Sequence, residues 1–318
     1  MLSRTAENLY WTARYVERAD SIARLLEVAY RIHLIPNTNE GYLSEWDSIL
    51  RASGIKEEYL RKHKEINKEK IEFFLLFDES NTSSIKSCIV KARNNLKMVR
   101  TAVTLEVWNT VNSWYHELEN YEQGRYTSKN LPEILDWVKK QVNLIKGTID
   151  HTQLVNDGFD FIRLGIYFER ADFTARIIDV KYFILLPSSS FVGSQVDNFQ
   201  WSLMLRSVSS YRGFKWAYGN SDIDYKKIID FLILSNICPR SIFFAVDKIN
   251  HHVNRLCQFY NSKNVVHRKI NTIYKGLLNS SAEQIINFGL HEFLTKFIDD
   301  ISNVYHDLEI VYFSGTQE

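Results

Sequence analysis

Residues 15–28 read YVERADSIARLLEV, and residues 167–180 read YFERADFTARIIDV. The two segments lie 152 positions apart, eight of their fourteen positions are identical, and three more exchange Leu for Ile or Glu for Asp. Self-similarity at a fixed spacing is the sequence signature of a repeated structural unit. The chain is therefore predicted to be internally duplicated.

Two shorter matches follow in the same order along both halves. The segment WDSILRAS, from Trp46, resembles WSLMLRSV, from Trp201, and FFLLFDESNTSSI at 73–85 resembles DFLILSNICPRSI at 230–242. The slow drift in spacing is what a few loop insertions would produce. We expect two repeat units, residues 1–152 and 153–318, which share one core and are related by a pseudo-twofold axis.

Composition excludes several classes of protein. The 318 residues are 45% hydrophobic and 24% charged, which is ordinary for a globular protein, and 39 Lys plus Arg balance 38 Asp plus Glu. No overall field draws such a chain to nucleic acid or to anionic lipid. The three cysteines form no CxxC pair, and the longest apolar runs are too short to span a bilayer. We expect a cytoplasmic protein that binds neither nucleic acid nor a membrane.

Low contents of glycine (12) and proline (4) favour long helices over a sheet with many turns. Apolar residues recur at helical spacing, and no sustained alternation of period two appears. The predicted fold class is all-α, with the two units forming a duplicated helical bundle. The most regular helical patterns cover residues 4–33, 84–118, 133–155, 159–186, 240–260 and 282–313.

Each repeated helix carries a charged stripe immediately beside its apolar face. Charged groups at such a boundary are partly desolvated and should hold partners, of which the nearest are Asp20 with Arg24 and Asp172 with Arg176, at i and i+4. The stripe either forms an ion-pair network that locks the two helices together or forms a ligand or catalytic site. Its members are Glu17, Arg18, Asp20, Arg24, Glu169, Arg170, Asp172 and Arg176.

Small residues on the apolar faces predict that the two helices approach closely. Alanines on the core face allow helix axes to lie at the short end of the usual range. We expect the helices to cross near Ala19 and Ala23 in the first copy and near the matching alanines 171 and 175 in the second. In that arrangement Glu17 and Arg24 would pair with the Arg176 and Glu169 of the other copy.

A further cluster occurs in the first unit alone, in ARNNLKMVRTAVTLEVWNTVN at residues 92–112. We expect these residues on one long helix, where Arg93 and Arg100 stand seven apart on one face and could clamp a carboxylate, a phosphate or a peptide. The alternative is a solvated face with Trp108 packed in the core. The candidate binding residues are Arg93, Asn94, Arg100, Glu106 and Trp108.

Motifs for metal and cofactor chemistry are missing from the sequence. None of the nine histidines has a Glu three residues before it, as a di-iron bundle would require. No HExxH, GxxxxGK, GxGxxG or GxSxG motif is present. We expect neither a metal nor a cofactor.

Four ordered segments resemble the bacterial alpha-E family, an all-helical domain of unknown function. They are MLSRTAENLYWTARYVERADSIARLLEV at 1–28, the segment at 92–112 quoted above, IYFERADFTARIIDVKYFILL at 166–186, and DFLILSNICPRSI at 230–242. The resemblance places the family's ER motifs on Glu17-Arg18 and Glu169-Arg170, and its long-helix motif on the cluster from Arg93 to Trp108. The chain departs from the family pattern at residues 94–97, where a Glu and a further Arg are usual, and at Ile166, where an Arg is usual.

The resemblance implies a working context, because such proteins are typically encoded beside circularly permuted ATP-grasp proteins and transglutaminase-like or proteasome-like peptidases. It suggests a peptide-modifying, amide-forming pathway. One hypothesis is an accessory protein that binds an ATP-grasp ligase, a peptidase or a peptide substrate. A second is an enzyme with Glu17 or Glu169 as general base and Arg24 or Arg176 as oxyanion clamp. A third is a homo-oligomeric scaffold with exposed aromatic patches.

The first two hypotheses predict different surroundings for the repeated glutamates. A catalytic Glu should lie in an open pocket with a raised pKa, whereas a structural Glu should lie in a closed network of ion pairs.

Overall fold

The computed structural model describes residues 1–33, 42–122, 126–185, 195–219 and 223–314. Over these residues the chain is all-α and contains no β-strand, which confirms the predicted fold class. The helices are α1 (Ser3–His33), α2 (Tyr42–Ala52), α3 (Lys56–His63), α4 (Lys68–Leu76), α5 (Ile85–Met98), α6 (Leu105–Glu122), α7 (Leu131–Thr152), α8 (Asp157–Leu185), α9 (Gln195–Ser207), α10 (Tyr211–Tyr218), α11 (Tyr225–Ile229), α12 (Ile242–Phe259), α13 (Val265–Leu278), α14 (Ala282–Phe288) and α15 (Leu290–Leu308).

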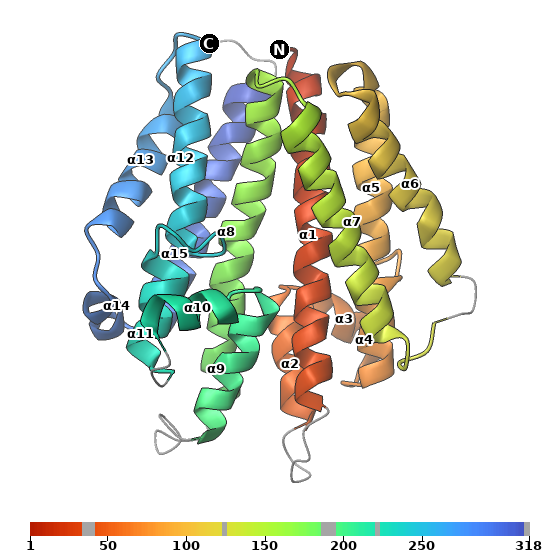
Figure 1. Cartoon of the computed structure of the whole chain (residues 1–318), viewed down its shortest axis with the longest axis vertical. Coiled ribbons are helices and arrows are strands. Elements are labelled where there is room, and N and C mark those ends of the chain that lie inside the picture. Colours follow the sequence, from red (N-terminus) through yellow and green to blue (C-terminus); the bar gives the residue numbers. More distant parts are fainter. Residues whose placement is uncertain (34–41, 123–125, 186–194, 220–222, 315–318) are drawn as a thin grey trace.

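The two longest helices, α1 and α8, pack against each other at the centre of the molecule (Figure 1). Helices α5 and α7 pack on α1, with α6 beyond them, and α12 and α15 pack on α8, with α13 beyond them. The shorter helices α2 to α4 and α9 to α11 lie toward the end of the bundle opposite the two termini (Figure 1). Helix α2 also contacts α8, and α9 also contacts α1. The internal duplication and the boundary at residue 152 stay predictions from the sequence.

Helices α1 and α8 approach each other closely at Gly165. A Cβ atom at this position would lie 2.3 Å from the carbonyl oxygen of Tyr10 and 3.0 Å from the Cβ of Ala13. No side chain fits there, because the obstacle is the backbone of α1. The alanines at 19, 23, 171 and 175 are fully buried, as the predicted crossing requires. The contact at Gly165 lies closer to the N-terminal ends of both helices than these alanines do.

The predicted helix at 84–118 is wrong as a single element. Helix α5 ends at Met98, a 3₁₀ turn follows at Arg100–Ala102, and α6 begins at Leu105. Val103 is extended, and the Thr104 hydroxyl accepts a hydrogen bond from the backbone N–H of Val107. The run VRTAVT is rich in β-branched residues, and its last Thr caps the next helix, so the chain turns here.

The predicted helix at 282–313 is also interrupted. Gly289, at φ +103°, ends α14 and precedes α15. The final turn at Glu309–Phe313 is π-helical. A positive φ of this kind is open to glycine at little cost, so the break follows from one residue. None of the helices in the described ranges has the length and apolar character needed to cross a membrane.

We predict that Gly165→Ala lowers the free energy of unfolding by about 1–3 kcal/mol, because the added methyl group meets backbone that cannot move independently. Urea unfolding followed by circular dichroism measures this loss. Gly147→Ala, in α7, is the matched control, because its Cβ would meet nothing within 4 Å. This control should be neutral or stabilising by up to about 1 kcal/mol, since Ala favours helix. Equal effects of both changes would contradict a close approach at Gly165.

Candidate functional site

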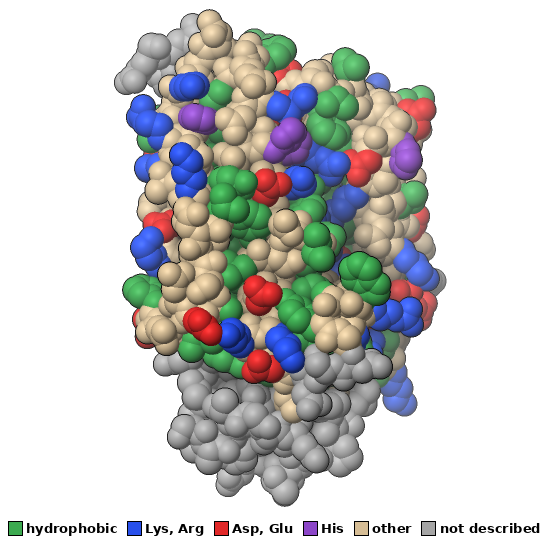
Figure 2. Space-filling model, turned by 60° about the vertical axis from the view of Figure 1, so that its left-hand side comes forward, with side chains coloured by type: hydrophobic (Ala, Val, Ile, Leu, Met, Phe, Trp, Pro, Cys, Tyr) green, Lys and Arg blue, Asp and Glu red, His purple; other side chains and the backbone are tan. Residues whose placement is uncertain are grey.

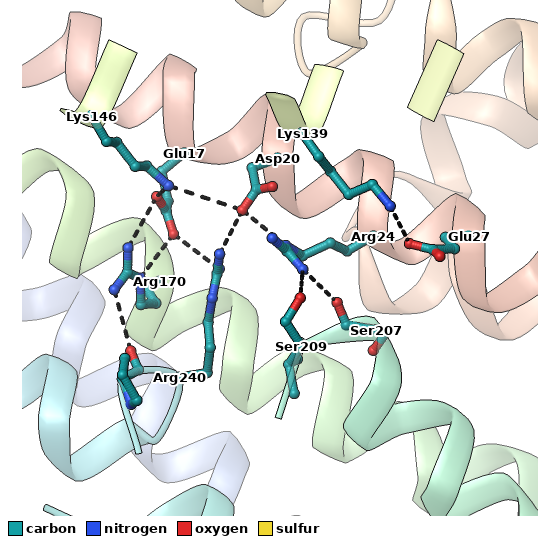
Figure 3. Close-up of polar contacts among 12 residues, drawn as sticks. Glu17, Asp20, Arg24, Glu27, Lys139, Lys146, Arg170, Ser207, Ser209 and Arg240 are labelled. Atoms are coloured by element: carbon teal, nitrogen blue, oxygen red, sulfur yellow. Dashed lines mark hydrogen bonds and ion pairs between the residues drawn. The ribbon is translucent and has the colours of Figure 1, made fainter. Parts of the chain in front are cut away.

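Glu17 lies at the centre of a buried network of ion pairs that joins α1 to α7, α8 and the segment before α12 (Figure 3). Its carboxylate accepts a hydrogen bond from Arg170 Nε of α8 at 2.9 Å and from the guanidinium of Arg240, before α12, at 3.2 Å. Lys146 of α7 forms a third ion pair with it. Three helices and one connecting segment therefore meet at one carboxylate that has no exposed surface.

Asp20, one turn further along α1, extends this network. Its Oδ2 accepts hydrogen bonds from Arg24 Nε at 2.9 Å and from the Arg240 guanidinium at 2.7 Å, so Arg240 bridges Glu17 and Asp20 (Figure 3). Arg24 also donates to the carbonyl of Ser207 at the end of α9. The network therefore ties α1 to the end of α9 as well.

A second network surrounds Glu169 on α8. Arg18 donates to both carboxylate oxygens of Glu169, at 2.6 and 2.9 Å, and Arg14 donates to one of them at 2.8 Å. Asp172 and Arg176 form an i, i+4 pair at 2.7 Å that is partly exposed. The Glu of each ER dipeptide is thus held by the Arg of the other.

These contacts confirm part of the predicted stripe and correct another part. The pairs Asp20–Arg24 and Asp172–Arg176 form as predicted. The predicted pairs Glu17–Arg176 and Arg24–Glu169 are wrong. Across the interface Glu17 pairs with Arg170, and Glu169 pairs with Arg18. Helices α1 and α8 run in parallel with the ER dipeptides at one level, so the nearest cation is the adjacent Arg rather than the one two turns on.

Burial and charge act in opposite directions on these carboxyl groups. Burial alone would raise the pKa of Glu17, but Arg170, Lys146 and Arg240 bring that pKa well below its ordinary value. Burial likewise opposes ionisation of Glu169, yet Arg18 and Arg14 lower its pKa to about 2. Burial lowers the pKa of Lys146 to about 8 in spite of Glu17 and Asp20. For the two glutamates, the attraction of the nearby cations outweighs the desolvation cost of the ionised carboxylate. For Lys146, the desolvation cost of the ammonium group is the larger effect.

Three members of the networks are absent from the sequence prediction: Arg14, Lys146 and Arg240. Arg14 stands four residues before Arg18 and could have been placed on the same face of α1. Lys146 sits beside Ile145 and Ile149 in an apolar stretch of α7, and a charge in that place needs a partner. Arg240 matches Ser83 of the first segment in sequence position. Because the two residues differ, a search for identical positions in the two segments does not find Arg240.

The candidate binding cluster at 92–112 is not the single-faced clamp that the sequence suggested. Arg93 lies on α5, donates to Asn112 at 3.1 Å and lies over the ring of Tyr115, whereas Arg100 lies in the 3₁₀ turn over the ring of Trp108. Both guanidinium groups contact side chains of α6. Trp108 packs against the core while partly exposed. The exposed members of the cluster are Asn94, Arg100 and Glu106.

Fold and site together define an all-helical protein whose two longest helices are joined by buried, reciprocal Glu–Arg pairs. Within the described residues, no three His, Cys, Asp or Glu side chains are grouped to hold a metal ion. The chain belongs to the Alpha-E family, a predicted alpha-helical domain with a conserved ER motif, and the match covers residues 1–313. Comparison with curated proteins and with solved structures gave no match.

We predict that Glu17→Ala destabilises the fold by about 3–5 kcal/mol, because it leaves buried cations without their counter-charge. Chemical denaturation at neutral pH measures the loss. Asp136→Ala is the matched control, because it removes an exposed i, i+4 pair with Lys140 on α7. An exposed pair contributes little, so this variant should unfold almost as the original does. If the two variants lose equal stability, the buried network does not hold the helices together.

We also predict that acid weakens the fold through Glu169. Its pKa of about 2 in the folded protein lies below the ordinary 4.5, so the unfolded chain binds the proton more tightly. The stabilisation is therefore complete above the ordinary pKa and is lost as the pH falls from about 5 toward about 2. Glu169→Gln should unfold more easily at neutral pH and should show a shallower loss with acid. A variant that follows the same pH profile as the original would contradict the assignment.

Proposed function

We propose that this protein is a non-catalytic binding module, an accessory partner of an ATP-grasp ligase in a peptide-modifying, amide-forming pathway. The observation that supports a non-catalytic role is the set of ion pairs around Glu17 and Glu169, in which each carboxylate is held by at least two cations. The ligase as partner rests on the setting in which proteins resembling this chain are encoded.

An acid–base enzyme that uses these glutamates fits the geometry less well. A general base needs a pKa near the working pH and room for the proton it accepts. Glu169 has a pKa of about 2, and both of its oxygens already accept hydrogen bonds from arginines. Glu17 has no exposed surface through which a substrate could reach it.

The partner or its peptide would contact exposed residues instead of the buried stripe. Asn94, Arg100 and Glu106 are exposed at the junction of α5 and α6, and Trp108 lies partly exposed beside Arg100. Arg and Trp are favoured at the centre of protein interfaces. Figure 2 shows the side of the molecule that carries α13 rather than this junction, and acidic and basic side chains are interspersed there.

The test is the affinity of the purified protein for an ATP-grasp ligase from the same organism, measured by calorimetry. We expect a specific complex that weakens about tenfold or more in Arg100→Ala/Glu106→Ala, because interface arginines carry much of the binding energy. Lys140→Ala, on the exposed face of α7, is the control and should bind as the original does.

Measuring amide-bond formation distinguishes a non-catalytic binding module from an enzyme. Mixed with a peptide and ATP, the protein alone should form no amide bond, and Glu169→Gln should change the melting temperature without changing any rate that the ligase complex shows. Amide formation by the protein alone, lost in Glu169→Gln at an unchanged melting temperature, would overturn the proposal in favour of an enzyme.

A further inference from the structure

A cavity of about 270 Å³ opens between α1 and α8 beside the Glu169 network. Arg18 and Ser21 line it from α1, and Glu169, Asp172 and Arg176 line it from α8. The turn at residues 53–55 and the side chain of Ser83 complete its wall. Gly54, in that turn, is exposed, and Asp172 and Arg176 are partly exposed, so the cavity communicates with the surface.

Ser83 stands where the other half of the chain has Arg240. In the matching segments at 73–85 and 230–242, both residues come directly before a Ser-Ile pair. Ser84 and Ser241 cap their helices in the same way, each accepting a hydrogen bond from the backbone N–H three residues on. Their backbone angles agree as well, at φ −60°, ψ 154° and φ −75°, ψ 156°. The two positions are therefore structurally equivalent at the entries of α5 and α12.

The carboxylate pair beside Arg240 accepts hydrogen bonds from one more guanidinium group than the carboxylate pair beside Ser83. Arg240 places its guanidinium between Glu17 Oε1 and Asp20 Oδ2, which also accept from Arg170 and Arg24. On the other side, the matching oxygens are Glu169 Oε1, which accepts from Arg18, and Asp172 Oδ2, which accepts from Arg176. Ser83 is uncharged and cannot supply the guanidinium that Arg240 supplies. Among the described residues, nothing takes the place of the Arg240 guanidinium there.

Ser21 provides a second, independent sign of a missing ligand. Ser21 lines the cavity and is 2% exposed, and its hydroxyl group has no hydrogen-bond partner among the described residues. An unpartnered buried hydroxyl is costly unless something in the cavity binds to it. A ligand with several N–H donors would satisfy this oxygen together with the two carboxylates.

We propose that the cavity binds a guanidinium group, supplied by the arginine side chain of a peptide or by free arginine. The ligand group takes the place that Arg240 takes in the other half, and it bridges Glu169 and Asp172. Guanidinium suits this place because its planar array of donors can contact two carboxylates at once.

The arginines that line the cavity do not exclude a third guanidinium. Around Glu17 and Asp20, three cations other than Arg240 are present, namely Arg24, Lys146 and Arg170. Around Glu169 and Asp172 there are again three, namely Arg14, Arg18 and Arg176. The two sites thus have the same balance of charge before the bridging guanidinium is added, and one of them demonstrably accommodates it. The low pKa of Glu169 keeps that carboxylate ionised.

This inference goes beyond the proposed function and does not depend on it, because it concerns a ligand class rather than a protein partner. Loss of ligase binding with guanidinium binding intact would remove the proposed function alone. The reverse result would remove this inference alone.

The probe is N-acetyl-arginine amide, titrated into the full chain by calorimetry, with N-acetyl-citrulline amide as a neutral control of the same shape. We expect the arginine compound to bind and the citrulline compound to bind about tenfold or more weakly, because charge-assisted hydrogen bonds are the stronger ones. Free arginine and a short arginyl peptide distinguish the two sources of the group. Equal binding of arginine and citrulline, or preferential binding of N-acetyl-glutamate or phosphate, would overturn the proposal.

Two variants of the protein test whether the probe binds in this cavity. Ser83→Arg should fill the cavity with its own guanidinium, abolish binding of the probe and raise the melting temperature. Asp172→Asn, at a partly exposed position, should weaken binding of the probe while the protein stays folded. If Ser83→Arg binds the probe as tightly as the original, the ligand lies elsewhere.

The reverse substitution, Arg240→Ser, provides a further test. Arg240→Ser should open a matching cavity beside Glu17 and lower the melting temperature, and low millimolar guanidinium should restore part of this loss, compared with sodium chloride at the same concentration. The original chain should also be stabilised by guanidinium at its own cavity, and Ser83→Arg should not. Rescue of Arg240→Ser with no effect on the original would show that the cavity beside Glu169 does not take the group.

Discussion

The structure depends on reciprocal ion pairs between α1 and α8. Each helix buries a glutamate that its own neighbours along the chain do not neutralise, and the partner helix supplies the arginine. Since an ionised carboxylate without a partner is very costly inside a protein, the two helices can be buried only together and only in register. The shared register in turn fixes where α5, α7, α12 and α15 can pack.

The fold class and the long helices were readable from the sequence because they depend on local periodicity, as for α1, α7, α8 and α12. The break at residues 99–104 was not, because the apolar spacing continues across it and only the capping by Thr104 reveals it. The short helices near α2 to α4 were missed for a related reason, since two or three turns carry too little periodic signal. The i, i+4 pairs were predictable because both partners belong to one helix.

The candidate site was predictable mainly in the residues that the two repeated helices carry. Glu17 and Glu169 could be found from the repeat, but Lys146 and Arg240 come from segments whose approach to α1 is a property of the tertiary fold. The choice between Arg18 and Arg24 as the partner of Glu169 also depends on whether α1 and α8 run parallel at one level. No single-sequence pattern contains that information, whereas the substitution of Ser83 for Arg240 was visible in the aligned repeats and acquired its meaning from the geometry.

The reciprocal pairing also has a consequence for the order of events during synthesis. Glu17 emerges early from the ribosome, but Arg240 lies 223 residues later in the chain. At an elongation rate of about 5–20 residues per second the delay is roughly 10 to 45 seconds. During that interval α1 cannot reach its final environment, because burying Glu17 would leave it without Arg170 and Arg240. The nascent first half is therefore expected to stay loosely packed and available to chaperones until the second half is made.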